Sequence, residues 1–557
     1  MKITLIALNA RYTHSAPALF YVRNALKARL PGCCVTLQQH TINDPYHATL
    51  LTIAASEPAA LFFSVYIWSS AVIERLLVDL RQLFPEIPLV LGGPQAPHLR
   101  LPAKLGHTVV HGPVEGLPDT FYDALARCRL APSYRAAPGA GFTMPYRPAD
   151  FSGPLRHRAL YYEASRGCPF ACSYCLSAVE RGMRTRSLDE ITGELALILA
   201  QRPAMVRFVD RTFNAAAERA LAIWQYLLAQ PGDTCFHFEI APDLFTQTML
   251  DFLATVPAGR FQFEIGLQST HPPTLAAVNR QMDLERALAN IRALVAMDTI
   301  HLHVDLILGL PAETQASYRQ SCNTVFALGS HYVQMGLLKV LPGTPLADQA
   351  AEFGLVHSAS PPYGLLANRW LDQDALAELY WFGEVVEAFY NNRYFRALFA
   401  YLRRKESDLF AFFKGLAAIY RHHGFFGRAR TQELLSAMLG ELAVSRPDHG
   451  LFLALLRYDW LACGHRFVPD HLGPLPLKET RDALWRRLPA AYPPLFNEQE
   501  RSEFFKRGVF APFSAELLSA VGFAAPPEGG VVCFLAEDAA GVLPRRRTVL
   551  LPVAAGS

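Results

Sequence analysis

The strongest constraint on the fold is a strand–helix pattern that repeats six times between residues 158 and 346. Short apolar runs that alternate with helical periodicity predict parallel strands joined by helices. Six units predict a partial (β/α)6 TIM-like barrel, whose chemistry is expected at the carboxyl ends of the strands. The predicted strands cover 160–166, 205–213, 236–241, 261–268, 301–309 and 332–340.

Residues 1–130 also alternate continuous apolar runs with helical patterns, which indicates a parallel sheet covered on both faces. Five predicted strands favour a flavodoxin-like, Rossmann-type α/β domain. Ligands of such sheets bind beyond the carboxyl ends of the strands, so the loops that follow the strands are expected to converge on one rim. The predicted strands are 2–8, 33–39, 60–66, 88–92 and 108–111.

The rest of the chain divides into a linker and a third domain. Residues 131–157 are rich in proline and glycine, which is typical of a segment between domains. Residues 347–557 have helical periodicity and many aromatic residues, so we expect a mainly α-helical domain with strand-like segments at 530–535 and 548–553. Its aromatic and arginine stripes fit either a core with a solvated rim or a lid over the barrel mouth.

Composition excludes several classes of protein. The 557 residues are 51% hydrophobic and 18% charged, with a net charge of +3. Such a chain is neither disordered nor fibrous, and it has no overall field for nucleic acid or anionic membranes. Residues 1–8 lack the features of a signal peptide, and the apolar stretch 58–73 is too short for a membrane helix. We therefore expect no membrane span and a cytoplasmic protein.

Three of the ten cysteines crowd into one short segment, as Cys168, Cys172 and Cys175. Closely spaced thiols in a reducing compartment favour a metal centre over disulfides. A structural zinc site normally has four ligands, and no second cysteine pair or matching histidine pair lies nearby. An iron–sulfur cluster held by three cysteines instead leaves one iron open to a substrate or cosubstrate.

The C-x3-C-x2-C spacing, with Tyr174 before the last cysteine, resembles the radical S-adenosylmethionine (SAM) superfamily. The resemblance implies a 4Fe-4S cluster whose open iron binds SAM, and reductive cleavage of SAM to methionine and a 5'-deoxyadenosyl radical. Later segments resemble the same catalytic core in the same order. They supply the candidate SAM-binding residues Asp210, Glu239, Gln268 and Asp305.

These assignments have plainer alternatives. An acid near a strand end, such as Asp210, Glu239 or Asp305, is often only the N-cap of the next helix. Gln268 is expected to line the barrel, with no assigned contact. No residue is assigned a catalytic role beyond cofactor binding.

The first domain resembles the cobalamin-binding domains that often precede this core. The resemblance implies a corrin site at the rim, with candidate residues Asn9, His14, Ser64, Tyr66, Gly92, Gly93, Gly112 and Glu115. His14 lacks the acid two residues before it and the glycine three residues after it that accompany a cobalt-binding histidine, so its role is either cobalt ligand or loop packing. A domain of this topology could also bind flavin or serve only as a structural domain.

Together, these features predict a radical SAM enzyme that works with cobalamin, for example to methylate an unactivated carbon of a small or medium organic substrate. An electron donor such as flavodoxin or ferredoxin is expected, and a nucleic-acid substrate is not. The alternatives are radical cyclisation or rearrangement, and a non-catalytic iron–sulfur or cobalamin carrier or redox sensor.

Overall fold

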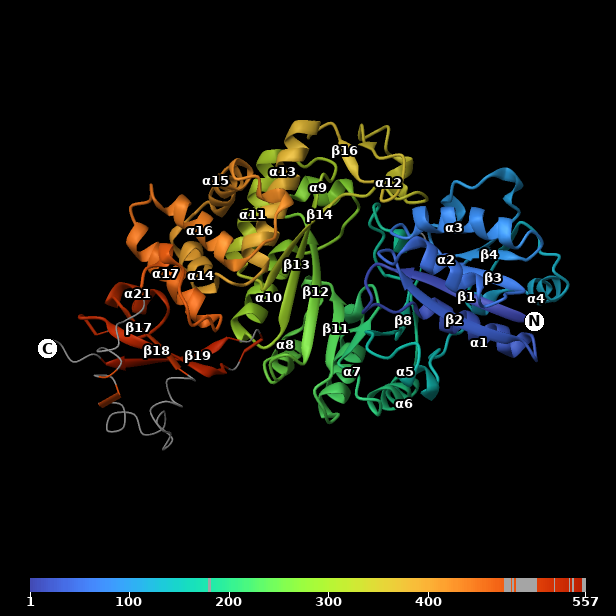
Figure 1. Cartoon of the computed structure of the whole chain (residues 1–557), viewed down its shortest axis with the longest axis horizontal. Helices are drawn as coiled ribbons and strands as arrows, with labels where there is room; N and C mark the ends of the chain where they lie inside the picture. The colour runs from blue at the N-terminus through green and yellow to red at the C-terminus, as the bar shows by residue number, and fades with distance from the viewer. Residues whose placement is uncertain are drawn as a thin grey trace. The chain divides into compact units, whose positions relative to one another are not determined.

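The computed structural model describes residues 1–178, 182–474, 482, 485–486, 508–524, 526–539, 541–542 and 545–552. The chain forms two compact units, whose elements are labelled in Figure 1. The first unit comprises Met1–Ile240, Val278–Arg280 and Lys339–Leu366. The second unit comprises Ala241–Ala277, Gln281–Leu338 and Ala367–Ser557.

The N-terminal sheet has six parallel strands in the order β2-β1-β3-β4-β5-β6. The first five follow the flavodoxin-like order, and β6 extends the sheet with residues that the sequence predicts as linker. The strands are β1 (Lys2–Asn9), β2 (Cys34–Thr41), β3 (Ala60–Ser64), β4 (Leu89–Gly92), β5 (Thr108–His111) and β6 (Ser133–Arg135). The helices are α1 (Pro17–Arg29), α2 (Tyr46–Ala54), α3 (Ser70–Leu83) and α4 (Asp119–Ala126).

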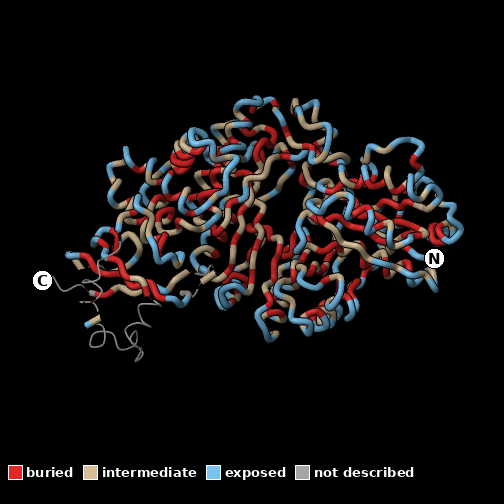
Figure 2. The backbone as a smooth tube through the Cα atoms, viewed as in Figure 1, coloured by how far each residue is buried: buried red, intermediate tan, exposed pale blue. Residues whose placement is uncertain are grey.

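Helices cover this sheet on both faces because its strands are apolar on both sides. Alternate residues of β1 point to opposite faces, so Leu5 joins one hydrophobic cluster and Ile6 the other. The cluster around Leu5 contains residues of α1 and α4, and the cluster around Ile6 contains residues of α2 and α3. Figure 2 shows buried residues in red along the inner strands and helices and exposed residues in pale blue mainly at the loops.

The second sheet has six strands in the order β14-β13-β12-β11-β10-β7, so each predicted strand–helix unit lies beside the next. The pairs β7–β10, β10–β11, β12–β13 and β13–β14 are parallel. The strands are β7 (Leu160–Tyr162), β10 (Met205–Phe208), β11 (Cys235–Ile240), β12 (Phe261–Gln268), β13 (His301–Leu308) and β14 (Tyr332–Leu337). The helices are α6 (Leu188–Leu199), α7 (Ala217–Ala229), α8 (Gln247–Leu253), α9 (Pro272–Ala277), α10 (Leu284–Met297) and α11 (Gln315–Leu328).

Burial alternates along β12 and β13. On each strand one set of side chains is fully buried and the other is half-buried. Gly266 pairs in register with Asp305, so these two residues share a face of the sheet. That half-buried face carries the polar residues of both strands, including Gln268, whereas the buried face is apolar.

The C-terminal region is mainly helical, as predicted. Its helices are α13 (Gln373–Val386), α14 (Arg396–Lys405), α15 (Leu409–His422), α16 (Gln432–Ala443), α17 (His449–Ala462) and α21 (Ala515–Ala520). A three-stranded antiparallel sheet follows, formed by β17 (Gly508–Phe513), β18 (Gly530–Asp538) and β19 (Arg546–Pro552). The last residue of the predicted strand 548–553 lies outside the described residues. In the part of the chain that the structure describes, no helix has the length and apolar character needed to cross a membrane.

A buried ion pair attaches the predicted linker to the N-terminal sheet. Asp150 lies in the short helix α5 (Pro148–Ser152) and forms a two-pronged pair with Arg23 of α1. Each side chain is only 6% exposed. Arg23 also donates from Nη2 to the carbonyl oxygen of Pro145 at 2.9 Å. The guanidinium therefore fixes two points of the linker against one helix.

We predict that Asp150→Ala lowers the free energy of unfolding by about 3–5 kcal/mol, because it leaves the Arg23 charge buried without its carboxylate. Asp119→Ala is the matched control, since Asp119 pairs with Arg29 of the same helix at an exposed site and should cost less than about 1 kcal/mol. Urea denaturation of both variants measures the difference. Equal losses would contradict the role assigned to the buried pair.

A second buried charged group lies at the start of the connection after β13. The Glu313 side chain is fully buried and accepts a hydrogen bond at Oε1 from the Ser269 hydroxyl, at 2.6 Å. Burial raises the pKa of Glu313 to about 7, although the Ser269 and Ser321 hydroxyls oppose the shift. The carboxyl group is therefore largely protonated at mildly acidic pH.

The raised pKa of Glu313 predicts a pH-dependent stability. The folded state binds the proton more tightly than the unfolded state, so stability is full below about pH 4.5 and falls as the pH rises to about 7. The loss is about 3 kcal/mol and levels off above that pH. Glu313→Gln, which mimics the neutral acid, should remove this contribution. Urea denaturation between pH 5 and pH 8 tests it, and an unchanged slope in the variant would contradict the prediction.

Candidate functional site

The three-cysteine segment forms a loop after the first strand of the second sheet. It lies between two short strands, β8 (Ser165–Arg166) and β9 (Arg184–Thr185), which pair with each other in antiparallel fashion. A single helical turn, Leu176–Ala178, follows the last cysteine. The loop is therefore closed at its base and lies where the barrel prediction places the chemistry.

Backbone contacts hold this loop from two sides. The Ser173 N–H donates to the carbonyl oxygen of Val278 at 2.9 Å, and the Ser173 carbonyl oxygen accepts from the Leu346 N–H at 2.9 Å. The Asn279 side-chain amide donates to the carbonyl oxygen of Ala171, also at 2.9 Å. Residues more than 100 positions further along the chain therefore hold this loop in place.

Gly167 permits the turn that leads into the first cysteine. Its φ of +93° is rarely adopted by residues with a side chain, and a Cβ there would lie 2.0 Å from the Gly182 carbonyl oxygen. Only glycine fits at this position, so the backbone before Cys168 packs directly against that of Gly182.

Polar and charged groups face the thiols. Arg280 approaches Cys172, with Nη1 at 3.6 Å from Sγ, and the Thr212 hydroxyl lies 3.4 Å from the Cys168 sulfur. Burial raises the pKa of the neighbouring Tyr174 phenol, and Cys172 adds to the increase while Arg280 opposes it. Arg280 therefore places a positive charge beside one of the three cysteines.

The donor set fits an iron–sulfur cluster. All ten cysteines are free of disulfides, and Cys168, Cys172 and Cys175 share one loop. Within the described ranges, no three His, Cys, Asp or Glu side chains converge as ligands of one metal ion, which differs from a preformed zinc site. A 4Fe-4S cluster needs no such convergence, because each cysteine binds a different iron. These three cysteines would hold it and leave one iron without a protein thiolate.

Asp210, predicted to contact SAM, holds the strand that leads into the cysteine loop. Its side chain is fully buried and accepts from the Ala164 N–H at 3.0 Å and from the Ser165 hydroxyl at 2.5 Å. Arg219 donates to the Ala164 carbonyl oxygen at 2.7 Å. Burial raises the pKa of Asp210 to about 6, against the effect of these hydrogen bonds. A direct contact with SAM stays a prediction.

Of the other SAM candidates, Glu239 and Gln268 lie near the ends of their strands, and Asp305 lies within its strand. Glu239, on β11, is half-buried and its carboxylate lies 3.7 Å from Arg211 Nη1. Gln268 ends β12 beside a register shift and has a φ of +71°. Asp305 lies on the same half-buried face of β13. Gln268 and Asp305 belong to the second unit, so their role at the SAM site stays a prediction.

The loop after β1 contains Asn9 and His14 and is pinned by two side chains. The Asn9 amide donates to the His14 carbonyl oxygen at 3.1 Å, and Arg158 donates to the same oxygen at 2.7 Å. The His14 ring stands edge-on to Tyr161. Burial lowers the pKa of His14, and Arg207 and Arg11 add to the effect, so the imidazole is neutral near pH 7. Whether it binds cobalt stays a prediction.

The loops after β3 and β4 lie side by side, as predicted. Ser64 and Gly92 pair in register at the ends of their strands. Gly93 has a φ of +104°, and a Cβ there would lie 2.5 Å from the Val65 carbonyl oxygen, whereas a Cβ on Gly92 would meet nothing within 4 Å. Tyr66 stacks on Trp68 at 4.5 Å. At this rim Gly93 lets two loops pack closely, whereas Gly92 faces open space.

The loop after β5 contains the last two candidates. Gly112 has a φ of +86°, and a Cβ there would lie 3.2 Å from that of Ala136. Glu115, in the turn Val114–Gly116, pairs with Arg166 Nη2 at 3.0 Å. Glu115 therefore contacts the segment before the cysteines. Sequence reasoning assigned no role to Arg166, because no spacing signal links it to a carboxylate 51 residues away.

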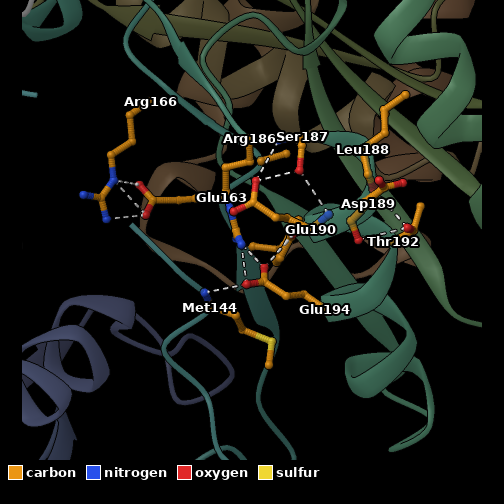
Figure 3. Close-up of polar contacts among 12 residues, drawn as sticks. Met144, Glu163, Arg166, Arg186, Ser187, Leu188, Asp189, Glu190, Thr192 and Glu194 are labelled. Atoms are coloured by element: carbon orange, nitrogen blue, oxygen red, sulfur yellow. Dashed lines mark hydrogen bonds and ion pairs between the residues drawn. The ribbon is translucent and has the colours of Figure 1, made fainter. Parts of the chain in front are cut away.

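A second charged pair supports the start of α6 (Figure 3). Arg186 pairs with both oxygens of Glu194, which also accepts from the Met144 N–H at 2.9 Å and from the Tyr162 hydroxyl at 3.0 Å. The sequence Ser187-Leu-Asp-Glu190 predicts a capping box at the start of a helix, and Ser187 and Glu190 form it. The capping prediction is confirmed, and the Glu194 contacts are additional.

Comparison with known proteins agrees with this geometry. Residues 162–325 match the Radical SAM superfamily, and residues 351–517 match a family described as "Protein of unknown function (DUF4080)". The chain is 23% identical over 420 residues to the cobalamin-dependent radical SAM methyltransferase TokK of Streptomyces tokunonensis, covering 65% of this chain and 61% of that protein.

Two further proteins are similar over much of the chain. The 2-(S-pantetheinyl)-carbapenam-3-carboxylate methyltransferase of Streptantibioticus cattleyicolor is 24% identical over 452 residues, covering 69% of this chain and 63% of that protein. The chain thus spans less than two thirds of the length of these curated relatives. The solved structure of the cobalamin-dependent S-adenosylmethionine radical enzyme OxsB, with aqua-cobalamin bound, superposes with a TM-score of 0.53 at 14% identity, covering 82% of this chain and 80% of that chain.

The sequence match, the clamped three-cysteine loop and the shared fold lead to one conclusion. Residues 162–325 form a radical SAM domain, in a chain that is homologous to cobalamin-dependent radical SAM methyltransferases.

Proposed function

We propose that the chain is a cobalamin-dependent radical SAM enzyme that methylates an unactivated carbon of a small or medium organic substrate. The observation that carries the proposal is the loop of Cys168, Cys172 and Cys175, which is held in place at a strand end inside the matched domain. Two methyltransferases among the relatives favour methyl transfer over radical cyclisation or rearrangement.

The chain would position the cofactors and exclude water. When bound, the reduced cluster supplies the electron that cleaves SAM into methionine and a 5'-deoxyadenosyl radical. Arg280 would keep the thiolate of Cys172 in place, and Thr212 would contact the sulfur of Cys168. Asp210 would keep the strand before the loop in register. The electron would come from a donor protein such as flavodoxin or ferredoxin.

The first domain would hold the corrin at its rim. Gly93 lets the two loops approach each other, and Gly92 opens into space beyond the strand ends. Aqua-cobalamin is bound in OxsB, which has a similar fold. Asn9, Ser64 and Tyr66 belong to the same group of loops and would contribute polar contacts.

We predict that Cys172→Ala abolishes cluster assembly and the formation of 5'-deoxyadenosine from SAM, because two thiolates cannot hold the cluster. Cys34→Ala, at an exposed cysteine of β2, is the matched control and should retain both properties. Anaerobic reconstitution, iron and sulfide analysis and product quantification after reduction measure the outcome. An intact wild-type cluster that never cleaves SAM would favour the carrier or sensor alternative.

We predict that Gly92→Phe weakens hydroxocobalamin binding at least about tenfold, since the ring would occupy the free space at the rim. The iron content should not change. Gly193→Phe, at an exposed position of α6 where a Cβ also meets nothing within 4 Å, is the control. Corrin retained after gel filtration provides the measurement. Wild-type protein that retains its cluster but no corrin would remove cobalamin from the proposal and leave radical SAM chemistry.

A further inference from the structure

Arg166 joins three segments that are distant in the sequence. Its guanidinium forms a bidentate pair with Glu163, through Nε at 3.1 Å and Nη2 at 2.8 Å (Figure 3), and Nη2 also reaches Glu115 at 3.0 Å. Two aromatic rings also lie against the guanidinium, with the Tyr21 centroid at 4.9 Å and the Phe142 centroid at 4.3 Å. The residue thus contacts α1, the turn after β5 and the predicted linker.

These contacts are shielded from water and depend on the shape of arginine. The side chains of Arg166, Glu115 and Glu163 are 13%, 19% and 22% exposed. A planar guanidinium can satisfy two carboxylates and stack on two rings at once, whereas a lysine ammonium cannot. Burial raises the pKa of Tyr21, and its hydrogen bond to Glu163 adds to the increase, so the phenol also belongs to this network.

Anchoring the strand does not require the pair with Glu115. Asp210 already binds the Ala164 N–H and the Ser165 hydroxyl, and Arg219 binds the Ala164 carbonyl oxygen. The Arg166–Glu115 pair lies at the next residue, after the Ser165 that Asp210 binds. It connects the last residue of β8 with a loop that belongs to the rim of the first domain.

We propose that Arg166 is a positioning residue that couples the rim of the first domain to the cysteine loop. The inference rests on the proposed function, since the rim would hold the corrin and the loop the cluster. Glu115 lies three residues after Gly112 at the rim, and Arg166 lies two residues before Cys168. Only Gly167 separates Arg166 from Cys168, and its backbone packs so closely against the Gly182 carbonyl oxygen that no side chain would fit there. A displacement of Glu115 is therefore transmitted through Arg166 to the backbone next to Cys168.

The first test needs no cofactor. In Glu115→Gln, the backbone amides of residues 166–175 should exchange with deuterium about tenfold faster than in the wild type, because a charge-assisted hydrogen bond is weakened. Glu57→Gln is the matched control, since Glu57 pairs with Lys2 at an exposed site of the same domain and its loss should not alter this segment. Unchanged exchange in Glu115→Gln would overturn the positioning role.

The second test measures coupling. In cluster-reconstituted protein, saturating hydroxocobalamin should lower the SAM dissociation constant at least about fivefold in the wild type and in Glu57→Gln. In Glu115→Gln and in Arg166→Lys, hydroxocobalamin should leave the SAM dissociation constant nearly unchanged, although the cluster is retained. Equilibrium dialysis with SAM measures it, with corrin occupancy determined separately in each protein.

The outcomes separate the two proposals. If the wild type binds both cofactors but hydroxocobalamin does not change its SAM affinity, the coupling alone is overturned. The same conclusion follows if hydroxocobalamin changes the SAM affinity of Glu115→Gln and Arg166→Lys as much as that of the wild type. A wild type that binds no hydroxocobalamin overturns the coupling and the cobalamin part of the proposed function together. An intact cluster that binds no SAM overturns the proposed radical SAM activity.

Discussion

Three thiols can hold one cluster only if the loop that carries them keeps a fixed shape, and the first unit supplies that restraint mainly through backbone contacts. The loop is bonded to Val278 and Leu346, and its approach is set by Gly167. Ordering a residue costs about 1–2 kcal/mol of conformational entropy, so a loop with no partner of its own would not stay ordered. Segments far apart in the sequence therefore meet at the cysteines, which explains why the resemblance to the family is spread over the whole domain.

Buried ion pairs fix the position of the predicted linker against the helices next to it. Arg23 with Asp150, and Arg186 with Glu194, each bind a segment between residues 144 and 150. A buried pair adds little net stability compared with an apolar pair, but separating its members is strongly unfavourable. Such pairs therefore discriminate against alternative placements of this proline-rich segment. Only 18% of the chain is charged, and part of that charge serves this purpose.

Local patterns predicted the elements well, and long-range partners could not be predicted. The six strands of the second sheet and the capping box at Ser187 follow from periodicity and from a four-residue motif. Strand β17 was not predicted; it contains Pro512, and proline is tolerated at the edge position that β17 occupies. Glu115 was expected at a corrin, yet its partner Arg166 is 51 residues away and no spacing rule connects them.

The position of Asp210 changes where specificity for SAM should be sought. Both of its carboxylate oxygens are engaged, one by a backbone amide and one by a hydroxyl, and the side chain has no exposed surface. A ligand that bound this carboxylate would have to displace two hydrogen bonds and reach a side chain that has no exposed surface. These contacts favour a positioning role for Asp210, and its direct contact with SAM stays a prediction. Direct recognition would then depend on half-buried groups such as Glu239, which keeps 33% of its side chain exposed.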